Sequence, residues 1–181
     1  MFDVRLFTGL SLPPEVLINF EALLDELEPL ARIRWSPASQ LHITTKFVGA
    51  YPFHRVGELC RFLHGLPKAP KFSVTLTGLR YLKLEKGGWL LYAKVEPNEE
   101  LNQLAAAMDE ALAFYDVPRE WRPYMPHVTI GRVPGNNPWP ELDARVEANT
   151  ERPLGTFEVD EYHLYESTPS GYRNVSSISL A

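Results

Sequence analysis

Short runs of β-forming residues alternate along the chain with longer stretches that carry apolar residues at helical spacing. The apolar run over 2–10 predicts a strand, and the pair Pro13-Pro14 after it suits the first turn of a helix, which the following stripe of valine, leucine and phenylalanine predicts. Later segments repeat both patterns. Further strands are predicted over 41–49, 72–84, 89–95, 127–133, 157–165 and 172–180, and further helices over 53–66, over 101–115 and after a Pro/Gly/Asn-rich loop at 134–140. This mixture of elements predicts an α+β fold.

The chain also matches itself at an offset of 85 residues (127 − 42). His42-Ile43-Thr44 aligns with His127-Val128-Thr129, and apolar positions in three other elements align at the same offset. Each half therefore reads as strand, helix, His-x-Thr strand, helix, strand. We predict one domain over 1–181, made of two similar lobes about an approximate two-fold axis. Equivalent positions would then oppose each other, which places His42 and His127 on either side of a shared cleft.

The His-x-Thr pattern supplies the chemistry that a phosphodiester needs. Residues two apart in a strand project from the same face, so each lobe offers one imidazole and one hydroxyl to the cleft. With ordinary pKa values near ~6.5, two histidines can act as acid and base, one activating water and the other protonating the leaving oxygen. The hydroxyls of Thr44 and Thr129 can donate to the non-bridging oxygens, where charge accumulates.

Three further residues of the two motifs are weaker candidates. Arg132 has an odd offset from His127 and would face away in a regular strand, but a bulge at Gly131 could turn it toward the phosphate. Lys46 would share the face of His42 in a regular strand, where it could add positive potential to the cleft or be a solvated surface lysine. Phe47 is expected to pack in the core rather than stack on a base.

Composition and residue spacing exclude several classes of function and site. The net charge of −5 over 181 residues gives no basic footprint for an extended grip on duplex nucleic acid. The single cysteine, Cys60, cannot form an intrachain disulfide, and neither a signal peptide nor a membrane-length apolar run is present, so we expect a cytoplasmic location. The remaining histidines, His54, His64 and His163, lack metal-ligand spacing, and neither a phosphate-binding Gly-rich loop nor a serine elbow occurs. No metal and no cofactor are expected.

Several short segments match the pattern of one known family. They are Arg5-Leu6-Phe7 with Leu12-Pro13, Trp35, the run from Leu41 to Gly49, the run from Pro126 to Arg132, and Leu164-Tyr165-Glu166-Ser167 with Gly171-Tyr172 and Leu180. Together they resemble the two-histidine phosphoesterase superfamily, and within it the RNA 2′,3′-cyclic phosphodiesterase branch, long labelled 2′-5′ RNA ligase. The first motif of that branch often reads His-x-Thr-Leu. Here Thr45 takes the fourth position, where a change should affect packing more than chemistry.

The resemblance implies a bilobal α+β fold with an antiparallel sheet in each lobe, helices on the outer faces and a metal-free site in the cleft. It implies hydrolysis of RNA or nucleoside 2′,3′-cyclic phosphates to 2′-phosphates. By position, His42 would be the proton donor and His127 the proton acceptor, while Thr44, Thr129 and Arg132 would hold the phosphate. The residues alone do not decide which histidine is acid and which is base.

Other functions stay open from the sequence. The same acid and base could serve 2′-5′ RNA ligation or cleavage of 2′-5′ oligonucleotides, and a non-catalytic module that binds RNA ends is a further alternative. The expected partner is an RNA end or nucleotide with a 2′,3′-cyclic phosphate, bound by a monomer without membrane attachment. Five arginines could line an approach to the cleft: Arg32, Arg34, Arg119, Arg122 and Arg173.

Overall fold

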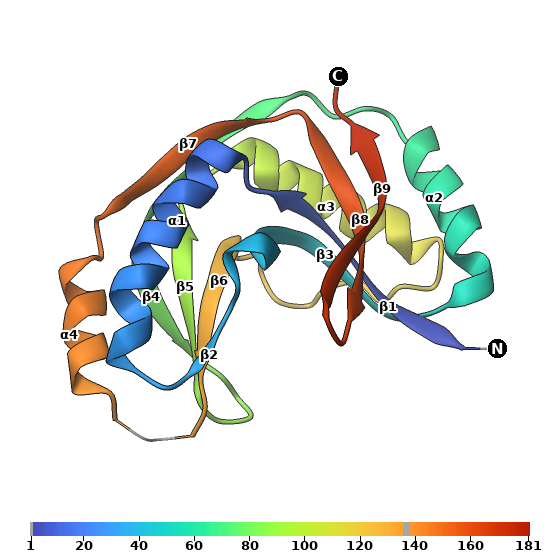
Figure 1. Cartoon of the computed structure of the whole chain (residues 1–181). Coiled ribbons are helices and arrows are strands. Elements are labelled where there is room, and N and C mark those ends of the chain that lie inside the picture. The colour runs from blue at the N-terminus through green and yellow to red at the C-terminus, as the bar shows by residue number, and fades with distance from the viewer. Residues whose placement is uncertain (1, 136–137) are drawn as a thin grey trace.

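The computed structural model of the chain describes residues 2–135 and 138–181 and builds them around two antiparallel sheets (Figure 1). The strands of these described residues are β1 (Asp3–Ser11), β2 (Arg34–Trp35), β3 (His42–Pro52), β4 (Phe72–Lys83), β5 (Trp89–Val95), β6 (His127–Val133), β7 (Pro153–Val159), β8 (Glu161–Thr168) and β9 (Gly171–Ser179). The first sheet has the order β3-β1-β8-β9, and the second has the order β2-β6-β5-β4-β7.

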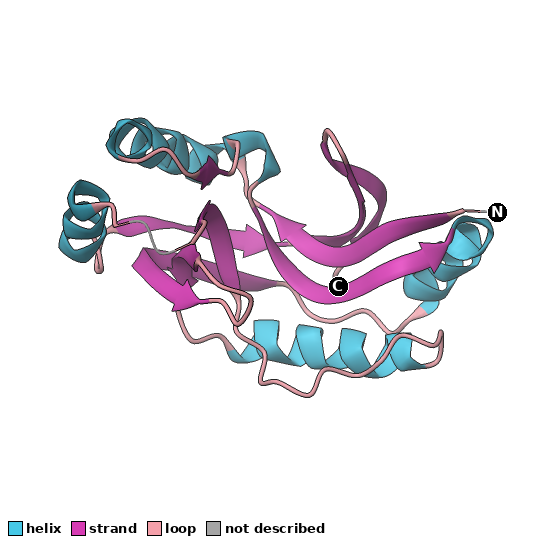
Figure 2. Ribbon diagram, turned by 90° about the horizontal axis from the view of Figure 1, so that it is seen from below, coloured by secondary structure: helices cyan, strands magenta, loops and turns pink. Residues whose placement is uncertain are grey.

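Four α-helices of the described residues lie against these sheets. They are α1 (Pro14–Leu27), α2 (Val56–Gly65), α3 (Glu99–Ala113) and α4 (Pro140–Ala148). Helix α1 packs on β7 and α4 on β4, while α3 packs on β3 and α2 on β9. Figure 2 shows the helices at the periphery of the two sheets. Short 3-10 turns (Glu28–Leu30, Ala38–Gln40 and Phe53–Arg55) complete the connections.

The repeat predicted from the sequence is visible in the strand registers. In the first sheet Thr8 pairs with Leu164, and in the second Ala93 pairs with Leu79. Ala93 lies 85 positions after Thr8, and Leu79 lies 85 positions before Leu164. The central strands of the two sheets therefore share one register, and the prediction of an α+β fold with two antiparallel sheets is confirmed.

The sheets do not coincide with the two halves of the sequence. The first sheet joins β1 and β3 to the late strands β8 and β9, and the second joins the early strand β4 to β5, β6 and β7. The strand predicted over 157–165 is wrong for this reason. The chain leaves the second sheet at the end of β7, passes Asp160 and enters the first sheet as β8. The predicted loop at 134–140 lies partly outside the described residues, and α4 follows it.

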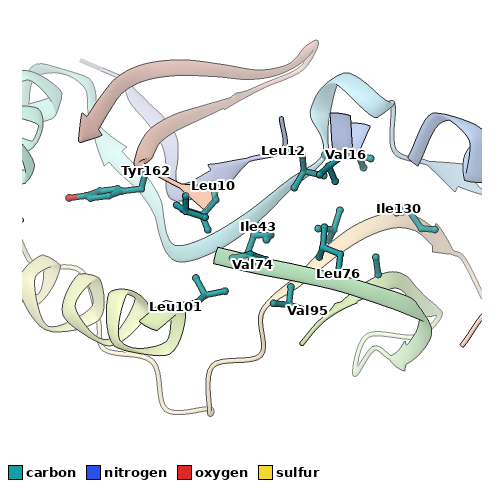
Figure 3. Packing of buried hydrophobic residues seen from close by; sticks show 14 of the residues in the cluster. Leu10, Leu12, Val16, Ile43, Val74, Leu76, Val95, Leu101, Ile130 and Tyr162 are labelled. Carbon is teal, nitrogen blue, oxygen red and sulfur yellow. The ribbon is translucent and has the colours of Figure 1, made fainter. Parts of the chain in front are cut away.

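A single hydrophobic cluster lies beneath both sheets. It includes Leu10 and Ile43 of the first sheet together with Val74 and Ile130 of the second, and all four are buried (Figure 3). One contiguous core is typical of one folding unit. The single domain over 1–181 stays a prediction.

Candidate active site

The two histidines begin equivalent strands and make equivalent hydrogen bonds. His42 opens β3 and His127 opens β6, and each donates from Nδ1 to the backbone carbonyl two residues earlier, on Gln40 and Met125, at 2.8 Å in both cases. A carbonyl can only accept, so Nδ1 carries the hydrogen in both rings. This leaves Nε2 of each imidazole as the atom that takes up or releases a proton.

The surroundings of both imidazoles disfavour their charged forms. Burial lowers the pKa of His42 below 6.5, the backbone bond from Gln40 opposes this effect, and the nearby charge of His127 lowers the pKa further. Burial likewise lowers the pKa of His127, against the bond to Met125 and with the help of the positive charge of Arg132. The effect of His127 on His42 fits the predicted arrangement of the two rings across a shared site.

Strand alternation places one threonine beside each histidine. In both strands the first four residues are half-buried, buried, half-buried and buried, so Thr44 shares the face of His42 and Thr129 that of His127. The Thr44 hydroxyl lies 3.1 Å from Nε2 of His42. Thr44 and His127 also line one cavity of about 440 Å³, which indicates that the two motifs border common space.

A bulge at Ile130 changes the face on which the later residues of β6 lie. Tyr92 pairs with Thr129 and Leu91 with Gly131, so Ile130 is the extra residue. Gly131 is then buried next to Ile33 and Trp35, while Arg132 is exposed and its charge acts on His127. The strand is therefore bulged, at Ile130 rather than at the Gly131 considered from the sequence, and the bulge brings Arg132 back to the face of His127.

The same bulge occurs at the equivalent position of β3, and it overturns two predictions. Thr8 pairs with Lys46 and Gly9 with Thr44, so Thr45 is the extra residue, and its buried hydroxyl bonds to that of Thr8 at 2.7 Å. The shift turns Lys46 inward, where its side chain is 1 % exposed. It turns Phe47 outward, where the side chain is 64 % exposed. Lys46 therefore lies off the face of His42, where it pairs with Asp109, and Phe47 does not pack in the core, because neither strand is regular.

Aromatic rings that were not predicted as neighbours of the histidines lie beside both of them. The rings of Phe7 and Tyr172 lie 4.9 Å and 4.8 Å from that of His42, and Phe7 also contacts Phe47 at 6.3 Å. Beside His127 lies Tyr92, at 5.5 Å. Phe7 and Tyr92 are equivalent in the repeat, so the 85-residue alignment already contained the signal for these two neighbours.

The segment between α3 and β6 joins the two motifs. The buried Lys46 ammonium donates to Asp109 on α3 at 2.7 Å and to the Pro118 carbonyl at 2.8 Å. Asp109 also accepts from the backbone N–H of Glu120, and the Tyr124 hydroxyl donates to the Thr44 carbonyl at 2.6 Å. Nothing in the spacing of the sequence indicated Asp109 or Tyr124. Three residues after Tyr124 the chain reaches His127.

The five arginines that could line an approach to the cleft lie in different surroundings from one another. Arg34 lies directly opposite Arg132 in the β2–β6 ladder. Arg122 pairs with Glu85, and Arg173 pairs with Glu166 at 3.2 Å. Arg32 and Arg119 are exposed. The structure therefore brings only Arg34 into the ladder of the second motif.

The other three histidines are either buried in the fold or exposed at the surface. His163 is buried and bonds to the hydroxyl of Ser177 at 2.8 Å, and His54 and His64 are exposed. Among residues 2–135 and 138–181, no three His, Cys, Asp or Glu side chains are grouped as a metal site would require. Over the same residues, no helix is long and apolar enough to cross a membrane.

Comparisons with known proteins show which proteins this chain is similar to. An RNA 2′,3′-cyclic phosphodiesterase from Methanocaldococcus jannaschii is 26 % identical over 174 residues, which cover 93 % of this chain and 95 % of the relative. The enzyme of the same name from Archaeoglobus fulgidus is 24 % identical over 170 residues, covering 93 % and 94 %.

Solved structures show the same fold. The crystal structure of E. coli LigT complexed with 3′-AMP superposes with a TM-score of 0.77 at 22 % identity, covering 99 % of each chain. The crystal structure of a Thermus thermophilus protein, TT0787, gives 0.76 at 24 % identity, covering 97 % of each chain. A family model described as the 2′-5′ RNA ligase superfamily matches residues 13–170. The chain therefore belongs to the 2′-5′ RNA ligase superfamily.

Proposed function

We propose that this protein hydrolyses RNA or nucleoside 2′,3′-cyclic phosphates to 2′-phosphates by metal-independent acid–base catalysis between two histidines. The observation that carries the proposal is the matched pair of imidazoles. Each is held by the same Nδ1 bond to a carbonyl, and each has a threonine on its own strand face. The relatives named RNA 2′,3′-cyclic phosphodiesterase supply the substrate class.

In the proposed mechanism the two Nε2 atoms move the protons. His127 takes a proton from water as the water oxygen attacks phosphorus, and His42 gives a proton to the 3′ oxygen as its bond to phosphorus breaks. The 2′ ester bond remains, so the product is a 2′-phosphate. This assignment of acid and base follows the family, because the hydrogen bonds of the two rings are alike.

Thr44, Thr129 and Arg132 are proposed to hold the phosphate while its charge is redistributed. Without substrate, the Thr44 hydroxyl lies beside Nε2 of His42, and a bound phosphate oxygen offers it a second acceptor. Arg132 is exposed on the same face as His127 and contributes a fixed positive charge. Preorganised donors of this kind stabilise the transition state without the cost of reorganising water.

The exposed aromatic surface beside His42 supports a nucleotide substrate. Phe47 extends from β3 in contact with Phe7, whose ring also lies against His42. A nucleobase can stack on such a ring whatever its identity, because every base has a π-face. We propose that the base of the terminal nucleotide stacks on Phe47.

The test is turnover of a nucleoside 2′,3′-cyclic phosphate in excess EDTA. We expect full wild-type activity and a loss of about 10²–10⁴-fold in kcat for His42→Ala and for His127→Ala, the range that general acid–base catalysis contributes. His163→Gln, which alters a buried histidine outside the pair, is the matched control. Undiminished activity in both alanine variants, or complete inhibition by EDTA, would exclude the mechanism. Binding of the cyclic phosphate without turnover would indicate a non-catalytic module that recognises RNA ends.

A second candidate is 2′-5′ RNA ligation, which the family description favours. It is the reverse chemistry, with an RNA 5′-hydroxyl in place of water, so the same acid and base serve it. Cleavage of 2′-5′ oligonucleotides would use them as well. Ligation yield and hydrolysis measured at matched RNA concentration separate these reactions. Action as a monomer in the cytoplasm stays a prediction.

A further inference from the structure

Two arginines face each other in the ladder that continues the second motif. Arg34 of β2 is the direct antiparallel partner of Arg132 of β6, and Trp35 is the partner of Gly131. Directly opposite residues of an antiparallel pair project from the same face of the sheet, with Cβ atoms about 5 Å apart. Arg34 therefore shares the face of Arg132, and both side chains are exposed.

Strand β2 is held by packing and hydrogen bonds, so the position of Arg34 opposite Arg132 is a fixed feature of the fold. The Trp35 ring lies next to Gly131, where a Cβ atom would come within 3.2 Å of the ring. Its Nε1 donates to the Ala31 carbonyl at 3.1 Å, and the N–H of Ser36 donates to the Ile130 carbonyl at 3.0 Å. Packing and hydrogen bonds on both sides of Arg34 thus keep it opposite Arg132.

Neither arginine is neutralised within the described part of the chain. Neither lies within 4.0 Å of a carboxylate there, whereas Arg122 and Arg173 each pair with a glutamate. Like charges directly opposite each other destabilise a sheet. In a chain with a net charge of −5, two adjacent cations without a carboxylate form a local site for an anion.

We propose that Arg34 and Arg132 together bind a phosphate group of the substrate, with Arg34 as a contact that the two-histidine motifs do not include. The planar guanidinium groups present forked donors that match phosphate oxygens, and one phosphate offsets the repulsion between them. The nature of this phosphate rests on the proposed function. It is either the reacting cyclic phosphate or the neighbouring internucleotide phosphate of an RNA end.

The experiment uses Arg34→Gln and two substrates, a cyclic mononucleotide and a dinucleotide that ends in a 2′,3′-cyclic phosphate. We expect kcat/KM to fall about 10-fold or more for Arg34→Gln, in the range of losing a charge-assisted bond. An equal fall on both substrates assigns the pair to the reacting phosphate, and a fall on the dinucleotide alone assigns it to the internucleotide phosphate. Arg61→Gln on α2, which removes the same charge from another exposed site, is the control.

The melting temperature, Tm, provides a second measurement, which distinguishes phosphate binding by Arg34 from a purely structural role. Without ligand, Arg34→Gln should have a Tm equal to or above that of the wild type, because one of two repelling charges is gone. Inorganic phosphate should raise the Tm of the wild type and of Arg61→Gln more than that of Arg34→Gln.

The outcomes separate this inference from the proposed function. If kcat/KM on both substrates falls no further for Arg34→Gln than for Arg61→Gln, the Arg34 contact is excluded while cyclic phosphate hydrolysis stands. If the wild type turns over neither substrate, the proposed function fails. The phosphate-induced Tm shift then tests by itself whether the two arginines bind phosphate. A shift lost only in Arg34→Gln supports the arginine pair, and equal shifts in all three proteins overturn it.

Discussion

At the scale of single residues, two imidazoles with the same hydrogen bond differ in their neighbours. Nδ1 of each ring donates to a carbonyl, and burial lowers the pKa of both. A proton on His127 lowers the pKa of His42, and the charge of Arg132 lowers the pKa of His127. The free enzyme therefore holds its pair mostly neutral at pH 7, and a bound phosphate anion would favour the protonated form of the acid.

The first prediction concerns the pH dependence of kcat/KM on a cyclic mononucleotide. One histidine must be neutral and the other protonated, so the profile is a bell whose limbs belong to the pair. Both pKa values are lowered from 6.5 in the free enzyme, which moves both limbs toward acid. We expect the maximum below about pH 6.5. A flat profile between about pH 5 and pH 9, or a maximum above about pH 7.5, would contradict the mechanism.

The second prediction concerns Phe47, which is exposed beside the site. Stacking of a base on an aromatic ring contributes about 1–3 kcal/mol, so Phe47→Ala should raise KM by roughly 10-fold with kcat nearly unchanged. Phe114→Ala is the control, because Phe114 is 79 % exposed but lies at the end of α3, outside the site. Steady-state kinetics on a cyclic mononucleotide measure both constants. An unchanged KM would show that the base lies elsewhere.

At the scale of elements, strand bulges decide which side chains reach the site. The two His-x-Thr tripeptides were predictable because alternation over three residues needs no knowledge of the ladder. Lys46 and Phe47 were not, because the bulge at Thr45 depends on how β1 pairs with β3. Nothing about Thr45 itself marks it as an extra residue. Arg132 came closer to prediction, since Gly131, which directly follows the bulge at Ile130, is a residue type that often marks a bulge.

The third prediction tests the ion pair that holds the segment before β6. Asp109→Ala would leave the buried Lys46 ammonium with the Pro118 carbonyl and the more distant Glu120 carboxylate. Removing one partner of a buried pair is strongly destabilising, and we expect a loss on the order of 3 kcal/mol in the free energy of unfolding. Glu120→Gln should cost far less, because Glu120 is half exposed and lies 3.5 Å away. Chemical denaturation measures both, and equal losses would contradict the assignment.

At the scale of the whole molecule, the sequence predicted the individual strands and helices better than it predicted which sheet each strand joins. Most strands and helices and the offset of the repeat could be predicted, since periodicity and alignment are local properties, and the two antiparallel sheets followed from the family resemblance. The exchange of strands between the halves could not be predicted. Asp160 interrupts an otherwise continuous β-type run, and only the pairing of β7 with β4 and of β8 with β1 separates the two strands.

The fourth prediction follows from this exchange of strands. A fragment over 1–85 lacks β8, which pairs with β1 in the first sheet, and β9, which pairs with β8, and a fragment over 86–181 lacks β4, which lies between β5 and β7 in the second. Neither fragment alone should unfold cooperatively, because each would expose the shared core. Co-expressed fragments should associate and recover activity, measured by thermal melts and cyclic phosphate turnover. A cooperative melt of either fragment by itself would contradict one domain over 1–181.

The bulge that both lobes share has a consequence for regiochemistry. A site made from a repeat offers its substrate two binding orientations, related by the approximate symmetry axis, and the two orientations exchange the acid with the base. The second position after each bulge breaks this degeneracy, since it carries Phe47 on one side and Arg132 on the other. On the proposed function, the base stacks on the ring and the phosphate charge lies at the guanidinium, so one orientation is favoured. On the proposed mechanism, these two divergent positions in a duplicated frame select which ester bond breaks, and hence which phosphate isomer leaves.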